Sequence, residues 1–146
     1  MDPPYTIIQL QRAYAEAGSQ IIYAPTFAAN RISLANHGLS GQVDHYNHAL
    51  VALSKEAVQG KALIAGDITT TSKMDAEYDE LLSAYEEQIT ALVDAGVDLL
   101  IAETMIGADE TMAVIDAAHA VCDLPILCSL TMQADGSLFF GGNIFE

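Results

Sequence analysis

The sequence predicts an α/β protein in which helices alternate with parallel strands. In the stretch 95–104 a helix ends at Gly96, a short apolar strand follows, and a carboxylate, Glu103, stands at the end of that strand. The same order recurs at 17–27, where Gly18 ends a helix ahead of a second apolar strand. The strands are apolar throughout, which is typical of strands covered on both faces. Helix–strand units with this spacing form right-handed crossovers and a parallel sheet.

The N-terminal half is expected to hold, in order, a helix over 5–17, a strand over 20–24, a loop with a short helix over 28–38, a helix over 42–58 and a strand near 61–66. The apolar face of the first helix consists of Ile7, Leu10, Tyr14 and Ala17. The buried stripe of the 42–58 helix is expected to consist of Val43, Tyr46, Leu50, Leu53 and Ala57.

The C-terminal half is expected to hold, in order, a Thr- and Ser-rich loop over 68–74, a helix over 77–94, a strand near 97–103, a helix from an Asp109 cap to about 121, a strand near 125–131 and a turn at Asp135-Gly136. The inward residues of the 77–94 helix are expected to be Leu81, Leu82, Tyr85, Ile89, Leu92 and Val93.

Four strands in 146 residues are too few for a closed (β/α)8 barrel, which typically takes about 250 residues. We therefore expect a single domain over 1–146 that forms an incomplete (β/α)8 TIM-type barrel. Residues that would meet the missing strands, such as Ile21, Ile64, Leu100 and Leu127, are expected to face water. The chain is then expected to form a homo-oligomer, or to be completed by further chain, because exposed apolar faces and open sheet edges favour association.

Composition excludes several classes of partner. The chain has 20 acidic and 5 basic residues and a formal net charge of -15, which disfavours nucleic acid and anionic membranes. It has no apolar run of the ~20 residues that span a bilayer and no basic start that would suggest a signal peptide. Cys122 and Cys128 do not make a disulfide framework, and we expect a cytoplasmic protein.

No functional role is expected for the cysteines or for the two histidines His45 and His48. Zinc sites usually need three or four ligands at close spacing, so Cys122 and Cys128 are expected to be core residues and no metal site is expected in this chain. Cys122 falls on the inward stripe of its helix, which also contains Met112, Ile115 and His119. His45 and His48 lie beside the buried stripe of their helix and are expected on a solvated flank.

Five segments resemble the homocysteine S-methyltransferase family, the zinc-dependent barrel module of cobalamin-dependent methionine synthase and betaine–homocysteine methyltransferase. They are the helix-to-strand entry at 14–22, the loop at 25–39, Ala65-Gly66-Asp67-Ile68, the stretch 96–104, and 125–131 with Gly136 and Gly141. The sequence departs from the family pattern at Pro25, where Asn is usual, and at Thr69-Thr70, where Gly-Pro is usual. The match corresponds to roughly the second to fifth strands of that barrel.

The resemblance implies a methyltransferase that moves a methyl group from a corrinoid, folate or related donor to a zinc-activated thiol such as homocysteine. It implies zinc in the full-length family, although the family's zinc cysteines have no counterpart in this chain. Cobalamin would be carried on a partner domain or protein, so a corrinoid protein is an expected partner. The fragment alone is expected to be inactive.

Four residues are the candidates for binding substrate. Glu103, at the C-terminal end of a strand, can hold the ammonium group of an amino acid by charge-assisted hydrogen bonds. Thr26 and Asn30 can donate to a substrate carboxylate, and Asp67 lies at another strand tip. Glu103 is expected to lie close to Thr26 and Asp67. The alternative is that these residues only hold their loops in place.

Two other functions stay open. One is a corrinoid-dependent demethylase component that binds a methyl donor, which the departures at Pro25 and Thr69-Thr70 favour. The other is a non-catalytic assembly module, which the open sheet edges favour.

Overall fold

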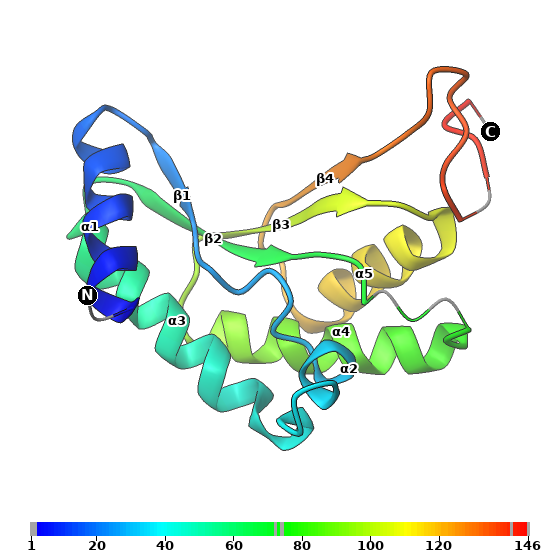
Figure 1. The fold of residues 1–146 in the computed structure, drawn as a ribbon, viewed down its shortest axis with the longest axis horizontal. Helices are drawn as coiled ribbons and strands as arrows, with labels where there is room; N and C mark the ends of the chain where they lie inside the picture. Colours follow the sequence, from blue (N-terminus) through cyan, green and yellow to red (C-terminus); the bar gives the residue numbers. More distant parts are fainter. Residues whose placement is uncertain (1–2, 72, 74, 141, 146) are drawn as a thin grey trace.

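The computed structural model describes residues 3–71, 73, 75–140 and 142–145. Helices and strands alternate along the chain (Figure 1). The strands are β1 (Ile21–Tyr23), β2 (Leu63–Ile68), β3 (Leu99–Met105) and β4 (Ile126–Leu130). The helices are α1 (Pro3–Glu16), α2 (Arg31–Ala35), α3 (Val43–Val58), α4 (Tyr78–Asp94) and α5 (Ala108–Val121), with a 3-10 turn, η1 (Ser40–Gln42), before α3.

Each helix and strand predicted from the sequence is present, with small shifts at the ends. The predicted loop over 68–74 includes Ser72 and Met74, and the family-like segment after β4 includes Gly141; these three residues lie outside the described part of the chain. No helix in the described part is both long and apolar enough to cross a membrane.

The four strands form one parallel sheet in the order β1-β2-β3-β4. Helices α3, α4 and α5 pack beneath this sheet, α1 lies at its left end against α3 and β1, and the described residues place no helix above it (Figure 1). A doubly wound sheet would carry helices on both faces. The one-sided arrangement confirms the predicted parallel βαβ units and is that of a barrel wall.

The main core lies between the sheet and the helices. Ile22, Ile64 and Leu100 point from the strands toward Tyr85 and other buried residues of the helices. Gly66 of β2 also faces the helices, and a Cβ at this position would lie 3.0 Å from Leu92 Cδ1. Glycine therefore lets α4 approach β2 closely.

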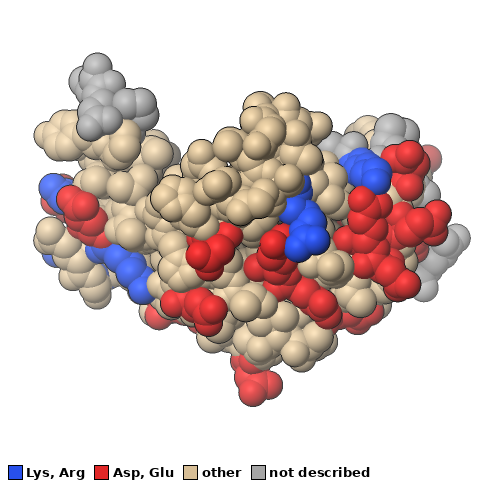
Figure 2. All heavy atoms as spheres, turned by 90° about the horizontal axis from the view of Figure 1, so that it is seen from below, with Lys and Arg blue, Asp and Glu red and all other residues tan. Residues whose placement is uncertain are grey.

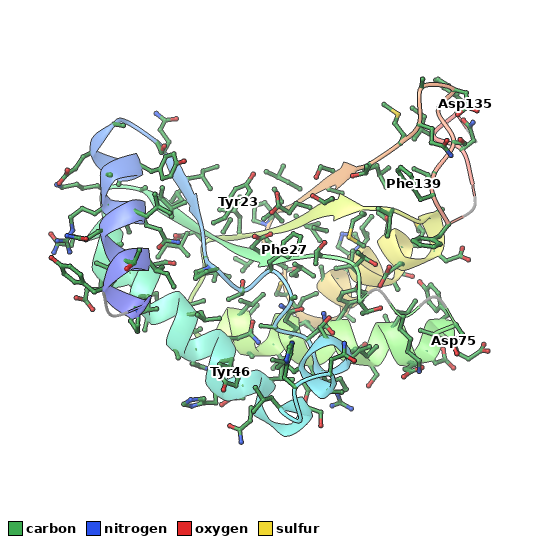
Figure 3. All side chains as sticks on the ribbon, in the orientation of Figure 1. Tyr23, Phe27, Tyr46, Asp75, Asp135 and Phe139 are labelled. Atoms are coloured by element: carbon green, nitrogen blue, oxygen red, sulfur yellow. The ribbon has the colours of Figure 1, made fainter. Side chains whose placement is uncertain are left out.

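The opposite side of the sheet, here called the helix-free face, is apolar and partly open to solvent. Leu63, Leu127, Tyr23 and Ile21 are 51%, 49%, 41% and 37% exposed, and Figure 3 shows Tyr23 on the side away from the helices. Between them Ala65, Leu99 and Ile101 make a small buried cluster of their own. These seven residues define the helix-free face.

The prediction for residues facing water is half right. Ile21 and Leu127 are exposed as expected, but Ile64 and Leu100 are buried against the helices, so the prediction was wrong for them. These strands carry apolar residues on both sides of the sheet. The sequence pattern therefore does not tell which side packs against the helices.

The predicted face of α3 is right at Val43 and Ala57 and is off by about one position between them. The buried residues are Val43, Asn47, Val51, Ser54, Ala57 and Val58, whereas Tyr46, Leu50 and Leu53 are only partly buried. The polar Asn47 takes a buried place because its Nδ2 donates to Ala29 O (2.9 Å) and Val43 O (2.8 Å).

The two outer helices of the layer leave apolar residues exposed. On α1, Leu10 and Tyr14 are 58% and 57% exposed, and Ile8 and Gln11 are buried instead. On α5, Met112 is 51% exposed and His119 is exposed, so the predicted inward stripe was wrong for these two, whereas Ile115 and Cys122 are partly buried and pack against the core. The N-cap of α5 is Gly107, with Asp109 inside the first turn, which corrects the predicted cap.

The segment after β4 returns to the C-terminal end of β3. Thr131 N donates to Met105 O (2.7 Å) and Phe140 N donates to Ile106 O (3.1 Å). The predicted turn at Asp135-Gly136 is present, with Gly136 at φ 85° and Ser137 N donating to Asp135 Oδ1 (3.0 Å). Acidic side chains spread over the helix-covered side (Figure 2).

Candidate functional site

The C-terminal ends of β1, β2 and β3 lie side by side and bring together three of the four residues singled out in the sequence. Thr26 is fully buried, and its hydroxyl accepts from Asp67 N (3.0 Å) and donates to Asp67 O (2.8 Å). The carboxyl group of Asp67 faces that of Glu103 from the neighbouring strand. The expected proximity of Glu103 to Asp67 is confirmed, Thr26 is bonded to Asp67, and the role of all three in binding substrate stays a prediction.

The Asp67–Glu103 carboxyl pair is the electrostatic centre of this site. Burial, the like charge of Glu103 and a hydrogen bond between the two carboxyl groups raise the pKa of Asp67 to about 8. Asp67 is 6% exposed, and its Oδ1 has no hydrogen-bond partner. Two carboxyl groups so close cannot both ionise freely, so at neutral pH they share a proton. A bound cation can take the place of that proton, because it relieves the same repulsion.

A distortion of β3 sets the position of Glu103. The register with β4 shifts between Ala102 and Met105, and Thr104 adopts φ 58°. A β-branched residue in the left-handed region is a genuine outlier, and such strain concentrates at functional sites. The bulge is held on both sides, because Thr69 Oγ1 donates to Glu103 O (2.9 Å) and Thr104 N donates to Ser129 Oγ (3.1 Å).

The loop after β2 is fixed by Glu110, a residue that the sequence analysis did not single out. Its carboxylate accepts hydrogen bonds from Thr70 Oγ1, from Thr71 N (2.6 Å) and Oγ1 (2.7 Å), and from the Tyr85 hydroxyl (2.8 Å). Burial and the Glu110 carboxylate raise the pKa of Tyr85. Two features of the sequence could have indicated this role. They are the three threonines that follow β2 and the glutamate in the first turn of the helix that follows β3.

The loop after β1 rests on buried amides. Gln88 Nε2 donates to Thr26 O (2.9 Å), and Asn47 holds Ala29 O. Asn30, the fourth candidate, caps α2 by accepting from Ser33 N (2.8 Å) through Oδ1. Its side chain is fully buried, and its Nδ2 has no hydrogen-bond partner. Asn30 therefore has a structural role, and both N–H donors of its amide group are unused.

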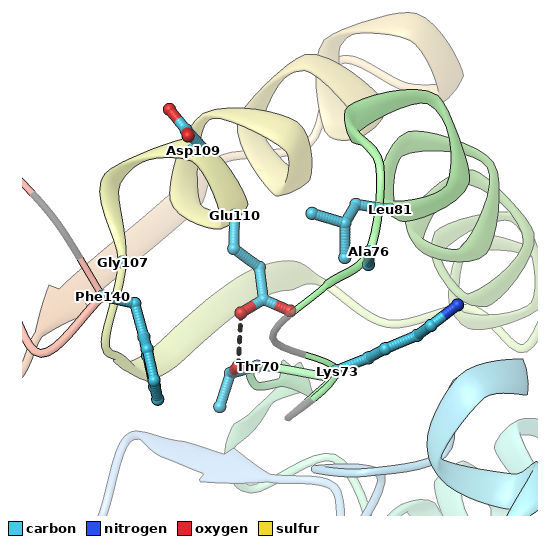
Figure 4. A pocket seen from close by; sticks show the side chains of 8 residues that line it. All are labelled: Thr70, Lys73, Ala76, Leu81, Gly107, Asp109, Glu110 and Phe140. Carbon is cyan, nitrogen blue, oxygen red and sulfur yellow. Dashed lines mark hydrogen bonds between the residues drawn. The ribbon is translucent and has the colours of Figure 1, made fainter.

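Two cavities adjoin the loop after β2. A cavity of about 120 Å³ is lined by Thr70, Lys73, Ala76, Leu81, Gly107, Asp109, Glu110 and Phe140, and Glu110 points into it toward Thr70 (Figure 4). A more open groove of about 720 Å³ runs between α2 and the loop and includes Arg31 and Lys73. Neither is lined by Asp67 or Glu103, and the cations of the groove are paired with Glu87 and Glu80.

The cysteines and histidines do not form a common site. Cys122 is half-buried at the end of α5, but Cys128 is exposed, so the expected core position is wrong for Cys128. The reason is that β4 is the edge strand of the described sheet, and of the described helices only α5 reaches it. His45 is exposed, and His48 lies with Nδ1 3.2 Å from Asp44 Oδ1, which confirms the solvated flank. Among the described residues, no three His, Cys, Asp or Glu side chains are placed to hold a metal ion.

The chain is similar to known enzymes over most of its length. It is 29% identical over 140 residues to betaine–homocysteine S-methyltransferase 1 of Danio rerio, and 28% identical over 147 residues to that of Bos taurus. The alignments cover 92% and 94% of this chain but 35% of each relative, so the chain spans about a third of their length.

Solved structures confirm the fold. The oxidized form of the homocysteine methyltransferase MmuM from Escherichia coli matches with a TM-score of 0.85 at 21% identity, over 98% of this chain and 56% of MmuM. The metallated form matches with a TM-score of 0.84 at 20% identity, over 99% of this chain and 57% of MmuM. A family model described as homocysteine S-methyltransferase matches residues 2–144. This chain therefore belongs to the homocysteine S-methyltransferase family.

Proposed function

We propose that this chain forms the part of a methyltransferase that holds the amino-acid portion of homocysteine. The observation that carries the proposal is the Asp67–Glu103 carboxyl pair at the C-terminal ends of adjacent parallel strands. The ammonium group of an amino acid is a cation with three donors, and it can replace the proton that the pair shares. The family and its betaine–homocysteine and homocysteine methyltransferase relatives support homocysteine as that amino acid.

Each candidate residue has a separate role in this proposal. Glu103 accepts hydrogen bonds from the ammonium group, and Asp67 ionises when that group binds. Thr26 holds the main chain of Asp67 in place through its two hydrogen bonds. The spare Nδ2 donor of Asn30 supports its assignment to the carboxylate of the substrate.

Activation of the thiol is not assigned to this part of the chain. The metallated form of MmuM supports a metal in the intact enzyme, and we propose zinc. The described residues do not fit a zinc site, because they offer no group of three ligands, so the ligands must come from elsewhere. A corrinoid or folate donor, with cobalamin on a partner, belongs to the same proposal. The free cysteines Cys122 and Cys128 support a reducing compartment such as the cytoplasm.

A demethylase component that binds a methyl donor is the second candidate. It is favoured by the loop at Thr69 to Thr71, which Glu110 holds in place of the usual Gly-Pro. A titration with methylcobalamin, in the presence and absence of homocysteine, distinguishes the two. Binding of homocysteine alone supports the first proposal, and binding of methylcobalamin without any homocysteine binding supports the second.

Isothermal titration of homocysteine tests the role of Glu103. We expect Glu103→Gln to weaken binding by about 1–3 kcal/mol, because a charged hydrogen bond to the ammonium group is lost. Glu56→Gln, an exposed position on α3, is the matched control and should not change binding. Equal affinity of the wild type and Glu103→Gln would show that this carboxylate is structural.

Proton release tests the carboxyl pair directly. With the pKa of Asp67 near 8, the pair holds a proton at pH 7, and binding of an ammonium group should release about one proton. Titrations at pH 7 in buffers of different ionisation enthalpy measure this number. Asp67→Asn should release none, whereas equal release by this variant and the wild type would place the proton elsewhere.

A further inference from the structure

The peptide group between Glu103 and Thr104 is held by two side-chain hydroxyl groups. Its oxygen, Glu103 O, accepts from Thr69 Oγ1 (2.9 Å), and its N–H, on Thr104, donates to Ser129 Oγ (3.1 Å). The register of β3 with β4 shifts at this point, and Thr104 adopts φ 58°. Hydroxyl groups from the segments on either side of β3 therefore fix the orientation of this one peptide group.

Thr69 is itself held by two further elements. It is 4% exposed. Its main-chain N–H donates to Phe27 O (3.1 Å) in the loop after β1, and its main-chain oxygen accepts from the Tyr85 hydroxyl (3.1 Å) of α4. The same Tyr85 hydroxyl also bonds Glu110 Oε1 (2.8 Å). Thr69 thus joins β3, α4 and the loop after β1, and its hydroxyl group is fixed without help from a ligand.

The Asp67–Glu103 carboxyl pair needs such an anchor because its members repel each other. Ile68 pairs with Ala102, so Thr69 lies opposite Glu103, and Asp67 stands two residues before Thr69. Alternate residues of a strand share a face. One short segment therefore supplies one carboxyl group of the pair and a bond to the main chain of the other. Adjacent carboxyl groups resist ionising together, so the pair would separate if the main chain of Glu103 were free to move.

We propose that Thr69 and Ser129 are positioning residues for the ammonium group of the substrate. Their hydroxyl groups fix the main chain of Glu103 and so hold its carboxylate beside Asp67, and they need no contact with the substrate. This inference rests on the proposed function, in which the carboxyl pair binds that ammonium group. A pair of acceptors that is already in place loses less freedom when the ligand binds. Thr69 contributes more than Ser129, because Thr69 is buried and Ser129 is exposed to competing water.

A carbon NMR titration of the carboxyl groups, without ligand, tests the positioning. Adjacent carboxyl groups titrate in two steps, so the upper apparent pKa of the pair, about 8 in the wild type, falls when the groups separate. Glu103→Gln gives the full size of this fall, which we expect to be about one to two pH units. Thr69→Val removes the hydroxyl group with little change of shape and should give most of that fall, and Ser129→Ala should give a smaller one. Thr69→Ser keeps a hydroxyl group and should keep the wild-type value.

Thr111→Val is the matched control for this titration. Thr111 is also buried, and its Oγ1 also donates to a main-chain oxygen, Gly107 O (2.7 Å), so this variant should leave the upper pKa of the pair unchanged. An unchanged value in both Thr69→Val and Ser129→Ala overturns the inference, as does an equal fall in Thr69→Ser. Ser129 is exposed, so Ser129→Ala decides alone if Thr69→Val does not fold.

Isothermal titration separates this inference from the proposed function. The wild type should bind homocysteine at least about tenfold more tightly than the analogue in which hydrogen replaces the amino group. Thr69→Val should lower this ratio by about fivefold or more, and Thr69→Ser should keep it. Equal weakening of both compounds by Thr69→Val would overturn the positioning role. Absence of homocysteine binding by the wild type would overturn the proposed function, whereas the carboxyl titration contains no ligand and still decides whether the two hydroxyl groups hold Glu103.

Discussion

Two carboxylates near the opposite ends of β3 meet opposite surroundings. Asp98, just before the strand, donates its N–H to Ile64 O (2.8 Å) and accepts from Ile64 N through Oδ2 (2.7 Å). Glu103, near the other end, lies at the bulge of β3 and faces the carboxyl group of Asp67 on β2. Asp98 completes the pairing of β2 with β3. Glu103 instead repels the ionised form of Asp67, and this repulsion remains in the folded protein. The N-terminal end of the sheet is therefore built for stability and the C-terminal end for binding, as in barrel enzymes.

Removing the carboxylate of Asp98 should give the largest loss of stability. Asp98→Ala leaves Ile64 N without its charged acceptor, and we expect the free energy of unfolding to fall by about 1.5–3 kcal/mol. Urea denaturation followed by circular dichroism measures the change. Asp123→Ala, at an exposed position after α5, is the control. Equal midpoints for the two variants would contradict a structural role for Asp98.

Removing the charge of Asp67 should change stability with the opposite sign. Because the folded pKa of Asp67 is raised to about 8, the native state keeps a proton that the unfolded chain loses near pH 4. Stability therefore falls as the pH rises from about 4 to about 8. Asp67→Asn should remove this fall and be more stable at pH 8 by several kcal/mol, because each pH unit between the two pKa values is worth about 1.4 kcal/mol. Denaturation curves measured over this pH range give the free energy of unfolding of both proteins. If that free energy changed with pH equally in the variant and the wild type, the prediction would be refuted.

Relief of the backbone strain at Thr104 should have the smallest effect. Glycine adopts φ 58° without the cost of a Cβ, so Thr104→Gly should raise stability by about 0.5 kcal/mol after the entropy of glycine is subtracted. Thr90→Gly within α4 should lower it by about the cost of a helical glycine. A fall in the melting temperature of Thr104→Gly would mean that the threonine side chain, and not the strain, dominates.

The order of helices and strands could be predicted because β1, β2 and β3 each follow a glycine that ends a helix, at Gly18, Gly60 and Gly96. The direction of side chains could be predicted only in part. Ile64 and Leu100 lie in strands with apolar residues on both sides, so the pattern leaves the face open. Asn47 occupies a core position of α3 through hydrogen bonds to main-chain oxygens that no periodicity reveals.

The candidate site could be predicted where it depends on topology. Asp67 and Glu103 end neighbouring parallel strands, and that alone places them at one edge of the sheet. The anchoring of Thr70 and Thr71 by Glu110 could not be predicted, because it joins the loop after β2 to the first turn of α5, 39 or 40 residues away, through side-chain geometry. The exposure of Cys128 was missed because an edge strand without a helix has the same apolar sequence as a covered one.

The buried hydroxyl of Tyr85 has a spectroscopic consequence. The chain has six tyrosines and no tryptophan, so its near-ultraviolet absorbance comes mainly from phenol rings. A phenol in water ionises near pH 10, whereas Tyr85, which donates to Glu110 and to Thr69 O, keeps its proton to higher pH. In an alkaline titration the phenolate absorbance of Tyr85 should thus appear only when the loop after β2 opens, so one native residue reports optically on that loop without an added label.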